Sequence, residues 1–275
     1  MKVDLHSHTA EHSSCARSSA LEMARTARQR GLDGLVISDH RVHLAPEECR
    51  DLEAAVPGIR VFRGVEIGIG GTGQDSAAWE DLVIVSEAPC ARLDGTGAGE
   101  IERLAEFRDR TGALMVLAHP FRYHREIVFD LDRFAPDAIE IASLQVDPND
   151  HDRILALARQ HGMQVVSNSD AHHVDDAALF YVDLDDDVAT ERELADAIRR
   201  GAFTLGGHGP TIADRGGRMA PIEDLARRVL AEGGTADDFL ASGGGHASFF
   251  DRVAGGGSYQ PNARAIGLRN PPPGP

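Results

Sequence analysis

The sequence predicts an α/β fold in which a parallel sheet, covered by helices, curls into a barrel. Helical patterns and short apolar runs alternate from residue 19 to residue 200, which is typical of parallel sheets. Leu35–Ile37 and Leu114–Leu117 are continuously apolar, so both faces of these strands should be covered. An open doubly wound sheet would satisfy both observations. However, polar clusters follow the C-terminal ends of five strands, and these can converge on one point only if the sheet curves around it.

Capping residues and glycines mark the ends of the predicted helices. Ser19 and Glu22 have capping-box spacing before the first helix, and Gly31 can end it. Asn149 and Thr190 are expected to cap two later helices. In chain order, helices are expected at 19–30, 46–55, 100–111, 149–161 and 191–200.

Apolar runs rich in β-branched residues mark the strands. In chain order, strands are expected at 3–5, 35–37, 59–65, 81–85, 113–118, 138–141, 164–166 and 180–184. Residues 68–79 are rich in glycine and small polar side chains and are expected to form a loop. Residues 1–208 are therefore expected to form one domain.

The last part of the chain differs in composition. Residues 209–275 contain two glycine triplets and end in a proline-rich segment. One helix is expected at 221–231, and the rest has few apolar residues to bury. We expect a Gly/Pro-rich C-terminal extension that is partly helical and partly flexible.

Composition limits the possible partners. The net charge of −16 disfavours a broad nucleic-acid-binding surface but is compatible with a small phosphorylated substrate. Lys2 is the only lysine, which excludes a Walker-type phosphate loop. The three cysteines are far apart, and neither a signal peptide nor a membrane-spanning run is visible, so we expect a cytoplasmic protein. The sequence does not define an oligomeric state.

Histidines and carboxylates make up the polar clusters at the strand ends. His6 and His8 flank one residue at the end of an apolar run, so their side chains should point the same way. Asp39-His40, Glu66, His119 and Asp170-Ala171-His172 occupy matching positions downstream. Nitrogen and oxygen ligands together suit zinc, manganese or iron, and the set exceeds the needs of one tetrahedral ion. We expect two or three divalent transition-metal ions, which fits phosphoester hydrolysis because such ions activate water and neutralise developing charge.

These clusters resemble the ordered motifs of the PHP (polymerase and histidinol phosphatase) family. The motifs are Asp4-Leu5-His6-Ser7-His8-Thr9, Ile37-Ser38-Asp39-His40, Gly64-Val65-Glu66, Ala118-His119-Pro120 and Ser169-Asp170-Ala171-His172. The resemblance covers residues 1 to about 207. It implies a distorted (β/α)7 TIM-like barrel with phosphoesterase activity.

The resemblance also implies roles for individual residues. His6, His8, Glu66 and Asp170 would hold a first ion, and Glu66 would bridge to a second ion bound by His119. His40 and His172 would hold a third ion. Asp170, Glu66, His40 and His172 are accordingly the candidate catalytic residues.

Several positions stay open. Asp81 stands where many relatives place a histidine, and it could be a ligand to the second ion or could cap its strand. His12 or Cys15 could complete the third site, or the site could lack a further ligand. Glu140 could orient a ligand histidine or could be purely structural.

Arginines are the expected phosphate-binding residues, because a guanidinium group can bind two oxygens at once. Arg41 and Arg122 each follow a ligand motif, and Arg17 and His124 are weaker candidates. The function predicted first is hydrolysis of a small phosphomonoester of the histidinol-phosphate or nucleotide-phosphate type. The alternatives are a phosphodiesterase or exonuclease acting on oligonucleotides, and a non-catalytic metal-binding regulatory module.

Overall fold

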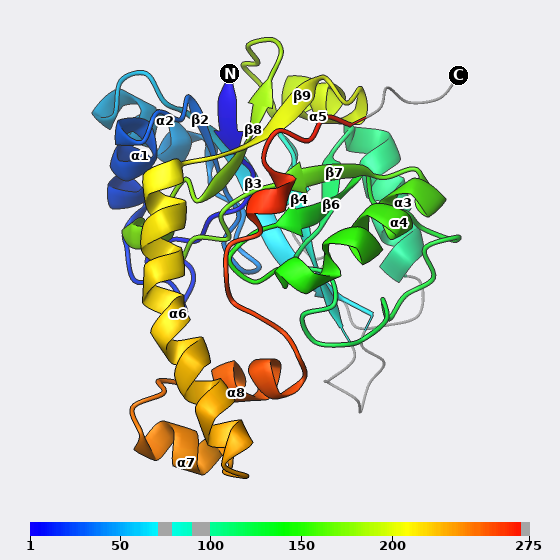
Figure 1. Ribbon diagram of the computed structural model, residues 1–275. Coiled ribbons are helices and arrows are strands. Elements are labelled where there is room, and N and C mark those ends of the chain that lie inside the picture. Colours follow the sequence, from blue (N-terminus) through cyan, green and yellow to red (C-terminus); the bar gives the residue numbers. More distant parts are fainter. Residues whose placement is uncertain (71–78, 90–99, 271–275) are drawn as a thin grey trace.

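A computed structural model describes residues 1–70, 79–89 and 100–270 (Figure 1). Its core is a nine-stranded sheet in the order β7-β6-β5-β4-β3-β2-β1-β8-β9. The strands are β1 (Lys2–Asp4), β2 (Gly34–Ile37), β3 (Arg60–Ile69), β4 (Glu80–Val85), β5 (Leu114–Leu117), β6 (Ala138–Ala142), β7 (Gln164–Ser167), β8 (Phe180–Leu184) and β9 (Phe203–Gly207). The helices are α1 (Ala20–Gln29), α2 (Pro46–Ala55), α3 (Glu100–Thr111), α4 (His151–His161), α5 (Glu191–Arg199), α6 (Gly209–Ala231), α7 (Ala236–Ala241) and α8 (Ala247–Ala254).

The sheet curls into a nearly closed barrel, as predicted. The hydroxyl of Ser167 on β7 donates to the carbonyl of Tyr181 on β8, at 2.7 Å. Beyond the strand ends, His8 N–H donates to the carbonyl of Ala171, and Asp170 N–H donates to the carbonyl of His6, both at 2.9 Å. These bonds connect β7, at one end of the sheet, to β8, which is next to the other end, and they bring the segments after β1 and β7 together.

The prediction of a parallel sheet is wrong for two strands, β4 and β8. β4 pairs antiparallel with both β3 and β5, and β8 pairs antiparallel with both β1 and β9. The β3–β4 connection carries no helix among its described residues, and strands joined directly usually form antiparallel pairs. β3 also extends to Ile69 instead of ending near residue 65, and β9 was not predicted.

Most helix boundaries follow their predicted caps. Ser19 and Glu22 form a capping box at α1, and Thr190 accepts a hydrogen bond from Glu193 N–H at α5. Asn149 does not cap α4; it lies in the 3-10 turn η1 (Pro148–Asp150), whose first turn is capped by the Asp147 side chain. Gly162 ends α4 with a φ of 69°, a conformation that glycine adopts without steric cost.

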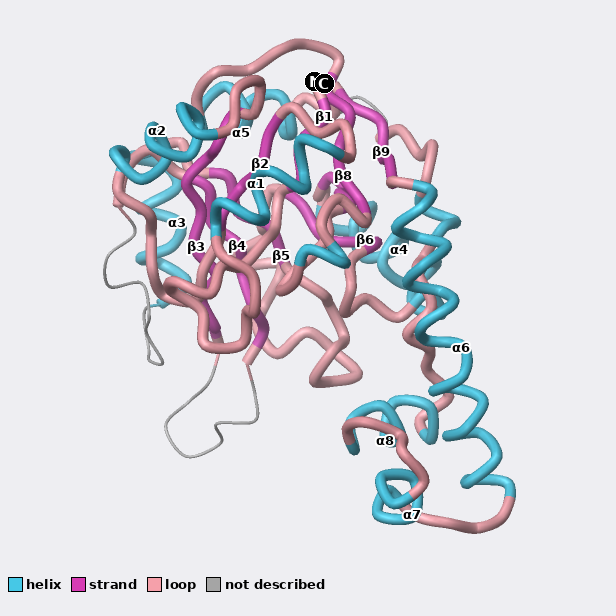
Figure 2. The backbone as a smooth tube through the Cα atoms, turned by 90° about the vertical axis from the view of Figure 1, so that its left-hand side faces the viewer, coloured by secondary structure: helices cyan, strands magenta, loops and turns pink. Residues whose placement is uncertain are grey.

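The C-terminal extension contains more helix than predicted. α6 begins at Gly209 and not at residue 221, and it runs away from the barrel to carry α7 and α8 at its far end (Figures 1 and 2). Apolar residues of α6, α7 and α8 form a small separate core: Ala226, Val229, Phe239, Phe250 and Val253. No helix in the described ranges is long and apolar enough to cross a membrane.

The chain returns from α8 to the barrel. The carbonyl of Leu268 accepts a hydrogen bond from Leu205 N–H on β9, at 2.9 Å. The Asn270 side chain accepts from Val165 N–H and donates to the Val165 carbonyl, both at 2.8 Å. The amide of Asn270 therefore satisfies the backbone of the edge strand β7.

Replacing Asn270 by alanine should destabilise the fold. Both buried backbone groups of Val165 would lose their partner, at a cost of about 2 kcal/mol in the free energy of unfolding. Urea unfolding would measure this loss. Arg264→Ala, which removes an exposed ion pair with Asp152, is the control and should change the free energy by less than about 1 kcal/mol. Equal stability of the two variants would contradict this role of Asn270.

Candidate metal centre at the mouth of the barrel

The predicted ligands converge at one end of the barrel. They come from β3, from β4 and from the segments that follow β1, β2, β5 and β7. Most of these side chains are buried. His40 is the most exposed of those that converge, with 45% of its side chain exposed. Three groups of side chains have ligand atoms close enough to share an ion: His6, His8 and Asp170; Glu66, Asp81 and His119; and His8, His40 and His172.

The first group has the spacing of a tetrahedral metal site. His6 Nε2 lies 3.0 Å from His8 Nε2, and Asp170 Oδ1 lies 3.5 Å and 3.4 Å from these two atoms. Glu66 Oε1 lies 3.4 Å from His6 Nε2, and Glu66 Oε2 lies 3.3 Å from His8 Nε2. Four atoms about 2.1 Å from a central ion would lie about 3.4 Å apart. Since Asp170 Oδ2 is also buried without a hydrogen bond, this donor set fits a divalent cation.

Electrostatics at the first group reflect this crowding. Burial lowers the pKa of His6, but the carboxylates of Asp170, Glu66 and Glu140 raise it well above its ordinary value. Burial opposes ionisation of Asp170, yet His6 and His172 hold its pKa well below the usual range. The centre thus favours ionised carboxylates that need positive charge beside them.

Glu66 connects the first group to the second. Its Oε1 lies 3.1 Å from His119 Nε2, which in turn lies 3.8 Å from Asp81 Oδ2. Tyr123 Oη donates to the same Asp81 oxygen at 3.1 Å. Burial, and then the nearby charge of Glu66, raise the pKa of Asp81. Asp81 therefore faces the centre, whereas a strand-capping role would have turned it toward backbone.

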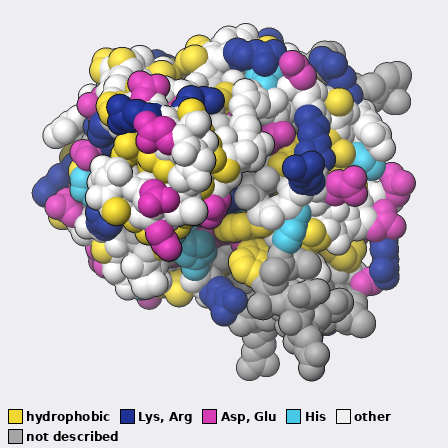
Figure 3. Space-filling model, turned by 60° about the horizontal axis from the view of Figure 1, so that its bottom comes forward, with side chains coloured by type: hydrophobic (Ala, Val, Ile, Leu, Met, Phe, Trp, Pro, Cys, Tyr) yellow, Lys and Arg dark blue, Asp and Glu magenta, His cyan; other side chains and the backbone are white. Residues whose placement is uncertain are grey.

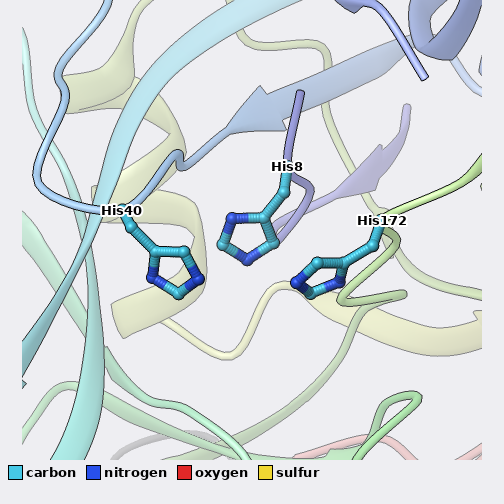
Figure 4. Close-up of side chains that lie close together, drawn as sticks. All are labelled: His8, His40 and His172. Atoms are coloured by element: carbon cyan, nitrogen blue, oxygen red, sulfur yellow. The ribbon is translucent and has the colours of Figure 1, made fainter. Parts of the chain in front are cut away.

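The third group is made of imidazoles. The ring of His8 stacks between those of His40 and His172, with centroids 4.5 Å and 4.3 Å apart (Figure 4). His40 Nδ1 lies 3.0 Å from Glu66 Oε2, so the same carboxylate reaches this group too. His172 Nδ1 lies 2.9 Å from the carbonyl of Asp170.

The two open candidates for the third site lie differently. Cys15 interacts with His172 and His40, and these interactions lower the pKa of its thiol. His12 is more than a quarter exposed, and its Nε2 lies 3.2 Å from Glu48 Oε1. Cys15 therefore lies nearer to the third group than His12 does, but Cys15 is exposed and its sulfur is not among the atoms that could share an ion with His8, His40 and His172.

Glu140 supports the centre from behind. Its Oε1 lies 2.7 Å from His6 Nδ1 and accepts from Asn168 Nδ2 at 2.9 Å, while its Oε2 accepts from His119 N–H at 2.8 Å. A proton on His6 Nδ1 leaves Nε2 free to act as a ligand.

Asp39 was part of a predicted cluster, but its role was not anticipated. Its carboxylate accepts hydrogen bonds from Thr9 N–H, Thr9 Oγ1 and Ser13 Oγ at 2.6–2.7 Å. Ser13 Oγ also accepts from His40 N–H at 3.1 Å and lies 3.4 Å from His8 Nδ1. The buried hydroxyls of Thr9 and Ser13 were the available sequence signal, and they fix the loop that follows the two first histidines.

Backbone strain is concentrated at this end of the barrel. His119, Asp170 and Arg41 have φ values of 26°, 51° and 60°, which residues other than glycine seldom adopt. Such conformations persist only where the surrounding structure enforces them, and they cluster at functional sites. Here two of them aim candidate ligands into the centre.

Among the candidate phosphate-binding residues, Arg122 lies nearest the centre. Its Nη1 is 3.4 Å from His119 Nε2, and its guanidinium lies over the Tyr123 ring, 4.9 Å from the centroid. The side chains of Arg41 and Arg17 are exposed, and their backbone N–H groups donate to the carbonyls of Glu66 and His172. His124 lines a neighbouring groove.

Comparisons with known proteins agree with this geometry. A family model described as PHP-associated matches residues 148–203. A probable phosphatase of Caldicellulosiruptor saccharolyticus is 28% identical over 207 residues, which cover 65% of this chain and 83% of that protein. The 5'-3' exoribonuclease Rnm of Escherichia coli (strain K12) is 35% identical over 78 residues, which cover 26% of this chain and only 27% of the exoribonuclease.

Solved structures share the fold. PsfC from Pseudomonas syringae superposes with a TM-score of 0.55 at 18% identity, covering 76% of this chain and 92% of that one. The lesion-specific endonuclease PfuEndoQ from Pyrococcus furiosus has a TM-score of 0.50 at 16% identity, covering 75% of this chain and 58% of that one. The ordered motifs, the barrel and these comparisons agree: the chain is similar to metal-dependent phosphoesterases of the PHP family.

Proposed function

We propose that this protein hydrolyses a small phosphomonoester, of the histidinol-phosphate or nucleotide-phosphate type, with two or three divalent transition-metal ions. The observation that carries the proposal is the sharing of Glu66 and His8 among three groups of ligand atoms. A single structural ion would need only one of these groups. Ions held side by side at such a centre activate water and neutralise the charge of a phosphoryl group.

In this proposal the side chains form three ion sites. His6, His8, Glu66 and Asp170 hold the first ion; Glu66, His119 and Asp81 hold the second; His40 and His172 hold the third, with Cys15 beside them. The half-exposed His40 ring leaves this third position open toward the substrate. Zinc, manganese and iron all suit the mixture of imidazole and carboxylate ligands.

Arg122 is proposed to orient the phosphoryl group. Arg122 is exposed at the rim, and two contacts orient its side chain: Nη1 lies 3.4 Å from His119 Nε2, and the guanidinium lies over the Tyr123 ring. The nearby carboxylates keep it charged: burial lowers its pKa, but Asp170 and other acidic groups raise it overall. Arg41 and Arg17 would approach the substrate from the exposed rim.

The same centre could act on a phosphodiester, and the short match to an exoribonuclease favours that second candidate. The net charge of −16 opposes it, because a polyanionic strand would be repelled.

A panel of phosphomonoesters and diesters, assayed with manganese, zinc and iron, separates the two candidate functions. Faster turnover of the diesters would overturn the first candidate. A non-catalytic module is disfavoured because Glu66, His119 and Asp170 are all in place.

Purified protein should contain at least two transition-metal ions per chain by elemental analysis. A chelator should remove both the metal and the hydrolysis, and adding metal back should restore turnover. Fewer than one ion per chain after reconstitution would contradict a multinuclear centre.

Asp170→Asn should lower kcat/KM by about a hundredfold or more, because it removes an anionic ligand atom from the first group. Circular dichroism would check that the fold is kept. Asp175→Asn, a neighbouring exposed acid paired with His173, is the matched control and should keep full activity. Unchanged turnover after Asp170→Asn would remove this residue from the mechanism.

Glu140→Gln should weaken metal binding by about 10- to 100-fold, because an amide cannot accept from both His6 Nδ1 and His119 N–H while keeping its other bonds. Competition with a chelator of known affinity measures this change. Glu106→Gln, on the exposed face of α3, should leave the metal affinity as it is. Equal affinities would show that Glu140 does not position the ligands.

A further inference from the structure

The segment that follows the candidate ligand His172 lies against the C-terminal extension. It forms the 3-10 turn η2 (Val174–Asp176), which begins two residues after His172. The contacts that hold η2 come from the end of α1 and from α6, the first helix of the extension. The extension therefore reaches the chain next to a candidate ligand.

The position of the His172 side chain depends on how the chain continues. Backbone hydrogen bonds to the segment after β1 fix the chain at Asp170 and Ala171. The ring of His172, by contrast, bonds to its own segment, with Nδ1 2.9 Å from the carbonyl of Asp170, and its side chain is 23% exposed. The next structured point along the chain is η2, so the placement of η2 helps to set the direction of this ring.

Arg30, at the end of α1, holds η2 from the barrel. Its Nη1 donates to the carbonyls of Val174 and Ala177, both at 2.7 Å, and to that of Asp175 at 3.1 Å. Ser18 Oγ accepts from Val174 N–H at 3.1 Å. These bonds engage the backbone of η2 but none of its side chains.

The side chain of Asp176 is held by α6. Its Oδ1 accepts from Arg218 Nη2 at 2.7 Å, and its Oδ2 lies 3.8 Å from Arg215 Nη1. Arg218 Nε also donates to Asp214 Oδ2, at 2.9 Å, one turn earlier in α6. The second bond keeps the guanidinium of Arg218 directed at η2.

This pair differs from the other charge pairs of the surface. Charged side chains of both signs are interspersed over the face in Figure 3, and exposed pairs contribute little to stability. Asp176 is only 7% exposed. A buried carboxylate that loses its cationic partner is strongly destabilised, so the contact between Asp176 and α6 constrains the position of η2.

We propose that the extension positions His172 for the third ion through the ion pair between Arg218 and Asp176. Both are positioning residues, since neither belongs to a group that could share an ion. The pair fixes η2, and η2 keeps the ring of His172 beside those of His8 and His40. The inference rests on the proposed function, because the third ion is part of that proposal.

Hydrogen exchange of the chelator-treated full chain tests the positioning without any ion or turnover. Arg218→Gln removes the charge, so the amides of residues 172–178 should exchange about fivefold or more faster. Residues 38–41, which carry His40, should exchange as in the unchanged protein. A general loss of stability would instead speed both segments equally, and that result would overturn the inference.

Arg227→Gln is the matched control, because Arg227 is an exposed arginine of α6 that pairs with Glu223 within the same helix. It should leave the exchange of residues 172–178 unchanged. Arg218→Lys keeps the charge and should restore part of the protection. Combining Arg218→Gln with Asp176→Asn should add nothing to Asp176→Asn alone, since both remove the same ion pair. If thermal melting shows that Asp176→Asn unfolds, the two Arg218 variants carry the test.

Metal affinity gives the functional readout. In competition with a chelator of known affinity, one ion per chain should bind about fivefold more weakly to Arg218→Gln, and the others should bind as before. Unchanged affinity for every ion, or unchanged exchange at residues 172–178, overturns the inference. If the unchanged protein binds no ion, the proposed function fails; faster exchange at residues 172–178 would then still support the positioning of His172.

Discussion

The carboxylate of Glu66 is the point on which the rest of the centre depends. It is 1% exposed, and its two oxygens lie within 3.4 Å of nitrogens from His6, His8, His40 and His119. Burial raises the pKa of Glu66, but the surrounding histidines hold it well below the ordinary value. A buried carboxylate at the meeting point of four imidazoles is stabilised when cations lie between them, since neutral imidazoles cannot all donate to it.

The barrel makes this arrangement possible by bringing together residues that are far apart in the sequence. Glu66 lies on β3, whereas His6 and Asp170 follow β1 and β7, and the mouth closes through the backbone bond from Asp170 to His6. Asp4 strengthens the same junction by accepting hydrogen bonds from His6 N–H and Ser169 N–H. Because β4 is antiparallel to β5, its first residues, including Asp81, lie beside the end of β5, which His119 follows. A parallel β4 would have placed Asp81 at the opposite end of the barrel.

Much of this candidate site could be predicted from local sequence, because its candidate ligands occur in short motifs at the ends of apolar runs. One residue separates His6 from His8, and one separates Asp170 from His172. In an extended segment such residues point the same way, so each pair can be recognised without tertiary information. The direction of β4 could not be predicted in the same way, since an apolar strand reads alike in both directions. The strained backbone of His119 and Asp170 was equally invisible, because tertiary contacts impose it.

The extension was underestimated for a different physical reason. Its composition is poor in apolar residues, but Phe239 and Phe250 are large enough to build a small core with a few neighbours. Its contact with the barrel is made by polar groups, such as Arg252 with Gln145 and Asn149 with the carbonyl of Gly256. Hydropathy patterns do not register contacts of that kind.

A polar contact between extension and barrel has a functional consequence. An apolar interface would have filled the space beside Arg122 with side chains, since apolar surfaces are stabilised by close packing. Polar contacts at the rim instead hold the two parts together around a cavity that is lined by both arginines and aspartates. Substitutions in α6 and α8 would reshape this cavity without touching the candidate ligands on the barrel, because none of the groups that could share an ion lines it.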